Sequence, residues 1–247
     1  MKGLPYKLSN FAFITHHILE SSSINAGKAP DLTNTSDLKA LQRMRVAVSF
    51  FYFGQGLAFA SWASRIPDIK TSLSLSDAQL GTVLFALPVG QLATMAISGR
   101  LVTTYGSSKV IRLAAPAYAI VLTCLGLVTQ SWHLGLVLFF FGVVGNMCNI
   151  SVNTQGVAAE KMYGKPIMTS FHGAWSIAGF TGALIGLLMM NLHIAPYGHF
   201  WIIAGIVWLS TFLNYKQLIP GKAPKQPKQK LFVKPEGSLL KLGVIGF

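Results

Sequence analysis

The sequence predicts an all-α integral membrane protein with six transmembrane helices. Of its 247 residues 52% are hydrophobic and only 11% are charged, whereas about a quarter of the residues in a soluble domain are charged. Two long stretches, residues 113–159 and 171–215, contain no Asp, Glu, Lys or Arg. Because a spanning helix needs about 20 apolar residues, each stretch is expected to hold two helices joined by a tight turn. Two further apolar runs precede them.

The first span is expected at residues 46–64, where a charged segment that contains a proline, 65–70, ends it. In Ser76-Asp-Ala-Gln79 the spacing predicts a capping box, in which the Ser oxygen accepts the backbone N–H of Gln79 and the Gln side chain reaches back. The second span therefore begins near Asp77 and ends by Ser98. Pro88 frees a backbone carbonyl inside it and is expected to kink the helix.

Four further spans follow from the same pattern of apolar runs and polar breaks. We expect them at residues 110–130, 134–157, 170–190 and 200–218. The connecting segments are a basic turn with two glycines at 99–109, a hairpin at 131–133, a polar connector at 160–166 and a turn at 196–198. Gly182 and Gly186 in the fifth span have the small-xxx-small spacing that permits close helix crossing.

The chain divides into four segments on this basis. Residues 1–44 are expected to be a cytoplasmic tail without stable structure, and residues 45–219 to form the six-helix bundle. The Lys- and Pro-rich segment 220–237 is typical of a linker, and the apolar segment 238–247 is too short to cross a membrane. Met44 directly precedes the first span, which leaves open whether the residues before it are translated.

The distribution of basic residues predicts the orientation. If the N-terminus is cytoplasmic, 18 of the 20 Lys and Arg residues lie on the cytoplasmic side, and only Arg65 and Lys70 lie opposite. The net charge of +13 is therefore a topology signal. A nucleic-acid partner is not expected, because it requires basic residues gathered on one folded face with aromatic residues between them.

Polar residues inside the spans are the candidates for substrate binding. Tyr52 and Gln55 share one face of the first span, and Asn146, Asn149 and Asn153 share one face of the fourth. Gln91, one turn after Pro88, is placed to satisfy the freed carbonyl or to line a cavity. Amides in hydrocarbon need partners, so these faces should meet a polar solute near the membrane midplane. The alternative is hydrogen bonding between helices, worth about 0.6 kcal/mol per bond.

The sequence carries no sign of enzymatic chemistry. It has no metal-spaced His/Cys cluster, no paired buried carboxylates and no phosphate-cradling glycine loop, so we expect no catalytic residue, metal or cofactor. His172, at the start of the fifth span, is interpreted either as a structural hydrogen-bonding group or as a group that titrates near neutral pH. Cys124 and Cys148 lie inside spans and are expected to be packing residues.

Several motifs resemble the major facilitator superfamily. The segment from Gly99 to Lys109, Gly-Arg-Leu-Val-Thr-Thr-Tyr-Gly-Ser-Ser-Lys, is similar to the cytoplasmic gating loop between helices 2 and 3 of that family. The resemblance implies gating roles for Gly99, Arg100, Gly106 and Lys109. Thr103 stands where the family usually has an acid, which weakens the charge relay of this loop. Residues 61–70, 75–81 and 149–173 resemble the bacterial fucose-permease-like branch, which includes the YbjJ-type inner-membrane proteins.

The resemblance implies the N-terminal six-helix half of a two-bundle transporter. Residues 220–237 then resemble the linker between bundles, residues 238–247 the start of helix 7, and the C-terminal bundle is missing. The implied function is secondary active transport of a small solute across the bacterial inner membrane by alternating access. In that branch the position of Asn149 is often an aspartate, and this half has no intramembrane carboxylate for proton coupling.

Several points stay open at this stage. Sugar, drug and peptide substrates are all compatible with the sequence, and it does not specify the coupling ion, the direction of transport or the oligomeric state. The alternative functions are a six-helix membrane scaffold, a protein that pairs with itself, and a channel.

Overall fold

The structure, a computed structural model, describes residues 35–220. Within these residues six helical segments are long and apolar enough to cross a membrane, which confirms the prediction of an all-α integral membrane protein. Five spans are formed by single helices: α2 (Thr35–Ser64), α6 (Ser107–Leu125), α7 (Ser131–Tyr163), α8 (Met168–Asn191) and α9 (Pro196–Asn214). The remaining span combines α4 (Asp77–Leu84) with α5 (Ala86–Tyr105). The short α3 (Ile66–Ser72) and the 3-10 turn η1 (Tyr215–Gln217) complete the described elements.

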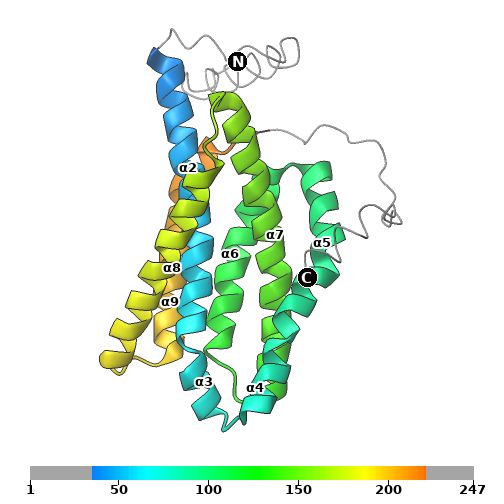
Figure 1. The fold of residues 1–247 in the computed structure, drawn as a ribbon, viewed down its shortest axis with the longest axis vertical. Helices are drawn as coiled ribbons and strands as arrows, with labels where there is room; N and C mark the ends of the chain where they lie inside the picture. Colours follow the sequence, from blue (N-terminus) through cyan, green and yellow to red (C-terminus); the bar gives the residue numbers. More distant parts are fainter. Residues whose placement is uncertain (1–34, 221–247) are drawn as a thin grey trace, which may run out of the picture.

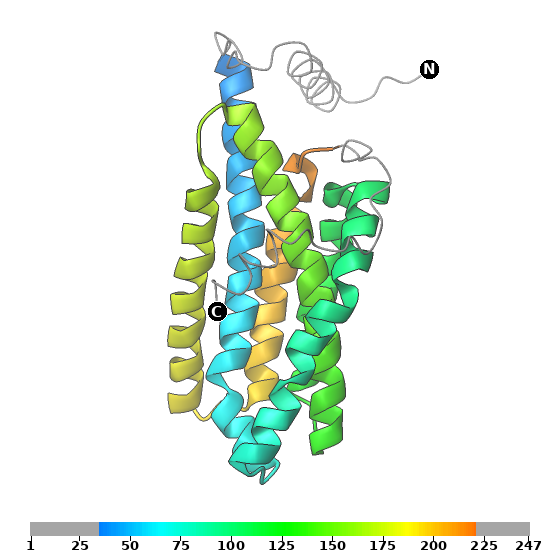
Figure 2. The same cartoon turned by 45° about the vertical axis from the view of Figure 1, so that its right-hand side comes forward.

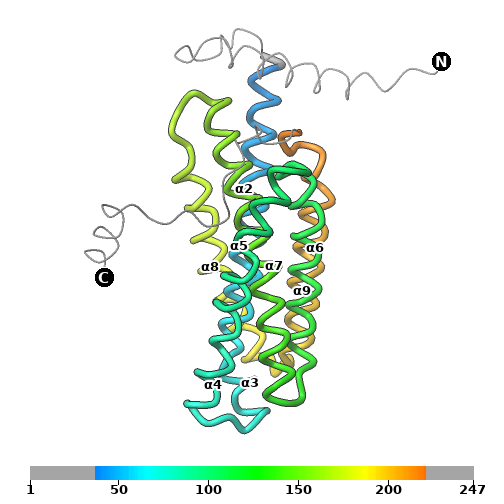
Figure 3. The backbone as a smooth tube through the Cα atoms, turned by 90° about the vertical axis from the view of Figure 1, so that its right-hand side faces the viewer, coloured from blue at the N-terminus to red at the C-terminus, as the bar shows by residue number. Residues whose placement is uncertain are grey.

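The spans run side by side along the long axis of the molecule (Figure 1). The helix α2 packs mainly on α8 and α9, whereas α7 packs on α5 and α6. Figure 3 shows α6 and α9 next to each other, and their contact joins the two groups. As a result α8 and α5 form opposite edges of the bundle (Figure 2). In each of these two edge spans only 17% of the apolar stretch that would cross the membrane is buried. Both spans therefore leave a large apolar surface uncovered.

The first helix begins at Thr35 and not near residue 46. Residues 35–44, expected in an unstructured tail, instead form the first turns of α2. The reason is that Leu41 and Met44, which are 3% and 1% exposed, pack in an apolar cluster with Met162 and Leu218. Residues 1–34, the linker expected at 220–237 beyond its first residue, and the short segment at 238–247 lie outside the described residues.

The span that contains Pro88 is interrupted at Phe85. Proline has no backbone N–H and cannot donate to the carbonyl of Leu84, so the helix breaks one turn before the proline, as expected for a kink. The capping box at the start of α4 is also confirmed, because the Ser76 hydroxyl accepts the Gln79 N–H and the Gln79 side chain accepts the Ser76 N–H.

The expected basic turn at 99–109 is wrong in its extent. The helix α5 continues to Tyr105 and α6 begins at Ser107, so that Gly106 alone separates them. Gly106 has φ 91°, a conformation that residues with a Cβ rarely adopt. The fourth span is likewise longer than expected, since α7 continues beyond residue 157 to Tyr163, where Gly164 ends it with φ 62°.

Glycines bring two pairs of helices into backbone contact. A Cβ added to Gly142 of α7 would lie 2.1 Å from the carbonyl oxygen of Leu87, and one added to Gly90 would lie 2.1 Å from that of Phe139. On the other side of the bundle, a Cβ at Gly182 of α8 would lie 3.1 Å from the carbonyl oxygen of Leu57 of α2, and one at Gly186 would lie 2.1 Å from the Ser64 side-chain hydroxyl. The small-xxx-small spacing therefore marks a close crossing, as predicted.

Candidate functional site

A chain of hydrogen bonds joins α2 to α7 through predicted site residues. The Tyr52 hydroxyl donates to Asn153 Oδ1 at 2.8 Å. Asn153 Nδ2 in turn donates to the backbone oxygen of Asn149 at 2.8 Å and to the Asn149 side-chain oxygen. The i, i+4 spacing of the two asparagines on α7 makes this possible, so each residue orients the next.

Tyr52 lies at the junction of three helices. Its side chain is 2% exposed, its ring stacks on Phe171 of α8 with centroids 5.5 Å apart, and the edge of His172 approaches at the same distance. Because the Tyr52 hydroxyl is already bonded to Asn153, Tyr52 acts on the site by holding Asn153. His172 is exposed, and within residues 35–220 its ring makes no hydrogen bond, only this contact with Tyr52.

Two further amides bond to backbone carbonyls of neighbouring helices. Gln55 Nε2 donates to the oxygen of Gly145 at 3.3 Å, which links α2 to α7. Asn146 Nδ2 donates to the oxygen of Gln91 at 2.7 Å, which links α7 to α5. The Gln91 side chain is exposed and does not bond to the Leu84 carbonyl that Pro88 frees. Gln91 therefore joins the site through its backbone.

The amide face, which comprises Gln55, Gln91, Asn146, Asn149 and Asn153, keeps several hydrogen-bonding groups free. Among the described residues no partner bonds to Gln55 Oε1, Asn146 Oδ1, Asn149 Nδ2 or the Gln91 side chain. Asn149 and Gln91 are exposed, and Asn146 and Asn153 are partly buried. Polar groups left open in hydrocarbon would cost free energy, so this face is built for polar surroundings.

The amide face lies near the middle of its helices. Gln55 stands ten residues from both Arg45 and Arg65, the charged residues that bracket the uncharged part of α2. At 1.5 Å per residue, Gln55 is about 15 Å along the helix from each. This places it near the centre of a hydrocarbon core that is about 30 Å thick.

The four gating candidates lie on α5 and α6, on both sides of the break between them. Gly106 is buried in the break between α5 and α6, whereas Gly99 lies inside α5. Arg100 and Lys109 are exposed and, in the part of the chain that the structure describes, pair with no carboxylate. Thr103, at the family's acidic position, bonds to its own helix through the oxygens of Gly99 and Arg100. It therefore does not replace the missing acid.

Two polar residues without a predicted role hold the bundle together near the ends of its helices. Gln155 of α7 is 1% exposed, and its Nε2 donates to the Ser107 hydroxyl at 2.8 Å and to the Ile219 oxygen at 3.1 Å. Its Oε1 accepts the Ile219 N–H at 2.8 Å. The Glu160 carboxylate accepts the backbone N–H groups of Ile167 and Met168 at the start of α8. Their polarity next to apolar runs could have marked them as candidates. The sequence could not show their roles, because the groups to which they bond lie elsewhere in the chain.

Comparison with known proteins points to membrane transporters. No protein-family profile matches the chain. It is 28% identical over 205 residues to an uncharacterized MFS-type transporter of Yersinia pestis, an alignment that covers 82% of this chain and 53% of the relative. It is 32% identical over 149 residues to an uncharacterized transporter of Sinorhizobium fredii, covering 60% of this chain and 40% of the relative.

A third relative is the membrane protein MosC of Rhizobium meliloti, 29% identical over 154 residues, with 62% of this chain and 36% of the relative covered. The chain thus spans about half the length, or less, of these curated relatives. Together with the six apolar helices, the relatives support a multi-pass membrane protein of the transporter class that is similar to MFS-type proteins.

Proposed function

We propose that the protein binds a small polar solute at the amide face and carries it across the bacterial inner membrane by alternating access. The observation that carries this proposal is the set of open amide groups near the middle of the spans. Amide oxygens accept and amide nitrogens donate hydrogen bonds, so the face suits hydroxyl or amide groups of a solute. The motifs at residues 61–70, 75–81 and 149–173 favour the fucose-permease-like branch.

In this mechanism the amide face forms one wall of a central site. The Asn149 Nδ2 group and the Gln55 and Asn146 oxygens bond to the solute, while Tyr52 holds Asn153, and through it Asn149, in place. A second six-helix bundle in a longer chain would supply the opposite wall, as in transporters built from two halves. The uncovered surfaces of α5 and α8 and the greater length of the relatives support such a partner.

The charge of the site bears on the class of solute. In residues 35–220 the acids are Asp37, Asp68, Asp77 and Glu160, and all four lie outside the middle of the spans. We therefore propose an uncharged polar solute, because the amide face itself offers no ion to pair with a charge. A coupling group, where the transport is ion-driven, would belong to the second bundle.

The test is a substitution that removes the open donor of Asn149. The protein expressed from its complete reading frame is screened against neutral monosaccharides, dipeptides and drugs, and binding is then measured for Asn149→Leu. The loss of a buried bond costs about 1–3 kcal/mol, so affinity should fall by about 5- to 150-fold with little change in melting temperature. Thr154→Val is the control. Within residues 35–220 the Thr154 hydroxyl donates to the Ile150 oxygen of its own helix, so the variant should bind the solute as the parent does.

One observation favours a second function, that of a six-helix scaffold that does not transport or that pairs with itself. Gln55 and Asn146 each already bond to a neighbouring helix, as amides that only join helices would. A destabilised Asn149→Leu variant with unchanged affinity would remove Asn149 from the solute site. Saturable solute uptake into vesicles that contain residues 1–247 alone would support self-pairing, since two copies would then complete the site.

A further inference from the structure

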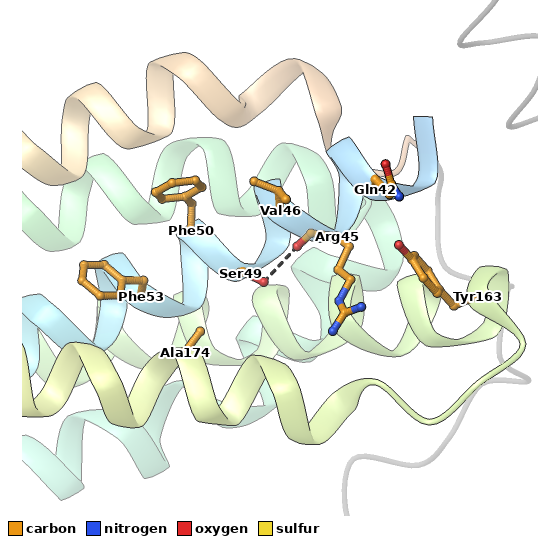
Figure 4. Close-up of a pocket in the computed structure, with 8 residues that line it drawn as sticks. All are labelled: Gln42, Arg45, Val46, Ser49, Phe50, Phe53, Tyr163 and Ala174. Carbon is orange, nitrogen blue, oxygen red and sulfur yellow. Dashed lines mark hydrogen bonds between the residues drawn. The ribbon is translucent and has the colours of Figure 1, made fainter. Parts of the chain in front are cut away.

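A groove lies on the surface of α2 near the end of the bundle that holds the start of this helix (Figure 4). Its volume is about 640 Å³, and it lies between α2 and the adjacent parts of α7 and α8. We call it the Arg45 groove, and it is lined by Gln42, Arg45, Val46, Ser49, Phe50, Phe53, Tyr163 and Ala174.

The Arg45 groove is separate from the amide face. On α2, Tyr52 and Gln55 point to α7, to which both donate hydrogen bonds. None of the five amide-face residues lines the groove. Arg45 precedes Gln55 by ten residues, about 15 Å along α2, so the groove lies nearer the start of this helix than the solute site does. Phe50 stands between the two, because it also lines a small cavity with Gln55.

The groove changes from polar to apolar along α2. Arg45 and Arg65 are 20 residues apart with no charged residue between them, which corresponds to about 30 Å of helix and matches the hydrocarbon thickness of a bilayer. Arg45 therefore stands at the level of the lipid headgroups. Phe50 and Phe53 follow about 7 and 12 Å deeper along the helix, where acyl chains lie.

The Arg45 guanidinium is available for a ligand. It lies 5.6 Å from the centre of the Tyr163 ring, which orients it. Within residues 35–220 the ion pairs are Arg65–Asp68 and Lys70–Asp77, and no carboxylate or side-chain acceptor bonds to Arg45. A guanidinium presents five N–H donors in a planar arrangement that fits phosphate.

We propose that the Arg45 groove binds one anionic phospholipid, with its phosphate on Arg45 and an acyl chain along Val46, Phe50 and Phe53. Exposed basic residues at the same end of the bundle, Lys39, Arg43, Lys161 and Lys165, favour an anionic headgroup over a zwitterionic one. The occupant is a lipid and not a free phosphate, because four of the eight lining residues are apolar and would contact an acyl chain. This inference requires only that the protein sits in a bilayer, so it stands apart from the proposed transport.

The test is native mass spectrometry of the full chain, released from a mild detergent to which phosphatidylglycerol or phosphatidylcholine has been added. One bound phosphatidylglycerol is expected, and phosphatidylcholine should be lost. Arg45→Gln should weaken phosphatidylglycerol binding about fivefold, the worth of one basic residue near an anionic lipid. Arg100→Gln is the matched control, because it removes the same charge from an exposed position on α5, outside the groove, and it should bind phosphatidylglycerol as the parent does.

A second variant tests the apolar part of the groove. Ala174→Leu narrows it without changing charge and should reduce the retention of phosphatidylglycerol, whereas soluble glycerol phosphate should not compete. If Arg45→Gln does not fold, Arg45→Lys and Ala174→Leu are tested instead. Arg45→Lys should keep phosphatidylglycerol binding, and Ala174→Leu should reduce it. Equal retention of the two lipids, an equal loss in Arg100→Gln, or the absence of any bound phosphatidylglycerol would overturn the proposal.

Discussion

The polar residues inside the spans fall into two kinds at the scale of single side chains. Gln155 uses both its nitrogen and its oxygen in bonds to Ser107 and Ile219. Asn149 is exposed, and its nitrogen has no partner within residues 35–220. A buried network whose groups are all bonded gives rigidity, whereas an open donor is available to a ligand. We therefore propose that Gln155 stabilises the bundle and that Asn149 is open to a ligand.

This assignment predicts opposite effects for the two amides. Gln155→Leu leaves the Ile219 N–H buried without a partner, which should cost about 1–3 kcal/mol of stability and lower the melting temperature while solute affinity stays unchanged. Thr154→Val, one residue away, should melt within the error of the parent. If Gln155→Leu is as stable as Thr154→Val, the contact with Ile219 does not hold the end of the bundle, and the distinction between the two kinds of amide fails.

At the scale of helices, glycines rather than apolar side chains determine how closely neighbouring helices approach each other. Gly90 and Gly142 bring the backbones of α5 and α7 together, and Gly182 does the same for α8 against α2. Small residues permit this approach in membranes, where lipid competes with apolar packing and close backbone contact supplies the attraction.

Gly142→Ala should consequently destabilise the bundle. The added methyl group would lie 2.1 Å from the Leu87 oxygen, a backbone atom that cannot turn away, and overpacking of this kind costs about 1–3 kcal/mol. Gly179→Ala is the matched control because a Cβ there meets nothing within 4 Å; it should be neutral or slightly stabilising through its helix propensity. Thermal unfolding of the two purified variants in detergent distinguishes them, and equal melting temperatures would refute the close α5–α7 contact.

The accuracy of the sequence-based prediction differs between elements for physical reasons. The six spans were predicted because charge-free runs are a local property, and the capping box at Ser76 depends on four adjacent residues. The start of α2 at Thr35 was missed because it depends on the packing of Leu41 and Met44 against α7 and the Leu218 region. The length of the break at Gly106 was missed because the sequence does not show how far α5 continues.

The candidate site was predicted only as a list of residues. Helical spacing correctly grouped Asn149 with Asn153, since both are on α7. The bond between Tyr52 and Asn153 joins residues 101 positions apart, and no periodicity predicts such a pairing. The same holds for Gln155 and Ile219, which are 64 positions apart. Whether these residues bind a solute stays a prediction.

At the scale of the whole molecule, charge is distributed unequally between the two ends of the bundle. Figure 1 shows α3 and the start of α4 at the end opposite to the start of α2. That opposite end carries Arg65 and Lys70, and both are neutralised by ion pairs, with Asp68 at 2.6 Å and with Asp77 at 2.5 Å. The exposed Arg100, Lys109 and Lys165 have no such partner in the described range.

The end with α3 holds only two Lys or Arg residues and the other end holds many more, which predicts a cytoplasmic N-terminus, because loops rich in Lys and Arg are retained on the cytoplasmic side. Single cysteines are placed at Thr71, in α3, and at Lys165, in the connector between α7 and α8; both positions are exposed. In intact cells a membrane-impermeant thiol reagent should label Thr71→Cys and spare Lys165→Cys, and both should react after the cells are lysed. The parent chain controls for Cys124 and Cys148, which lie within spans. Labelling of Lys165→Cys alone in intact cells would reverse the orientation, and the Arg45 groove would then face the outer leaflet.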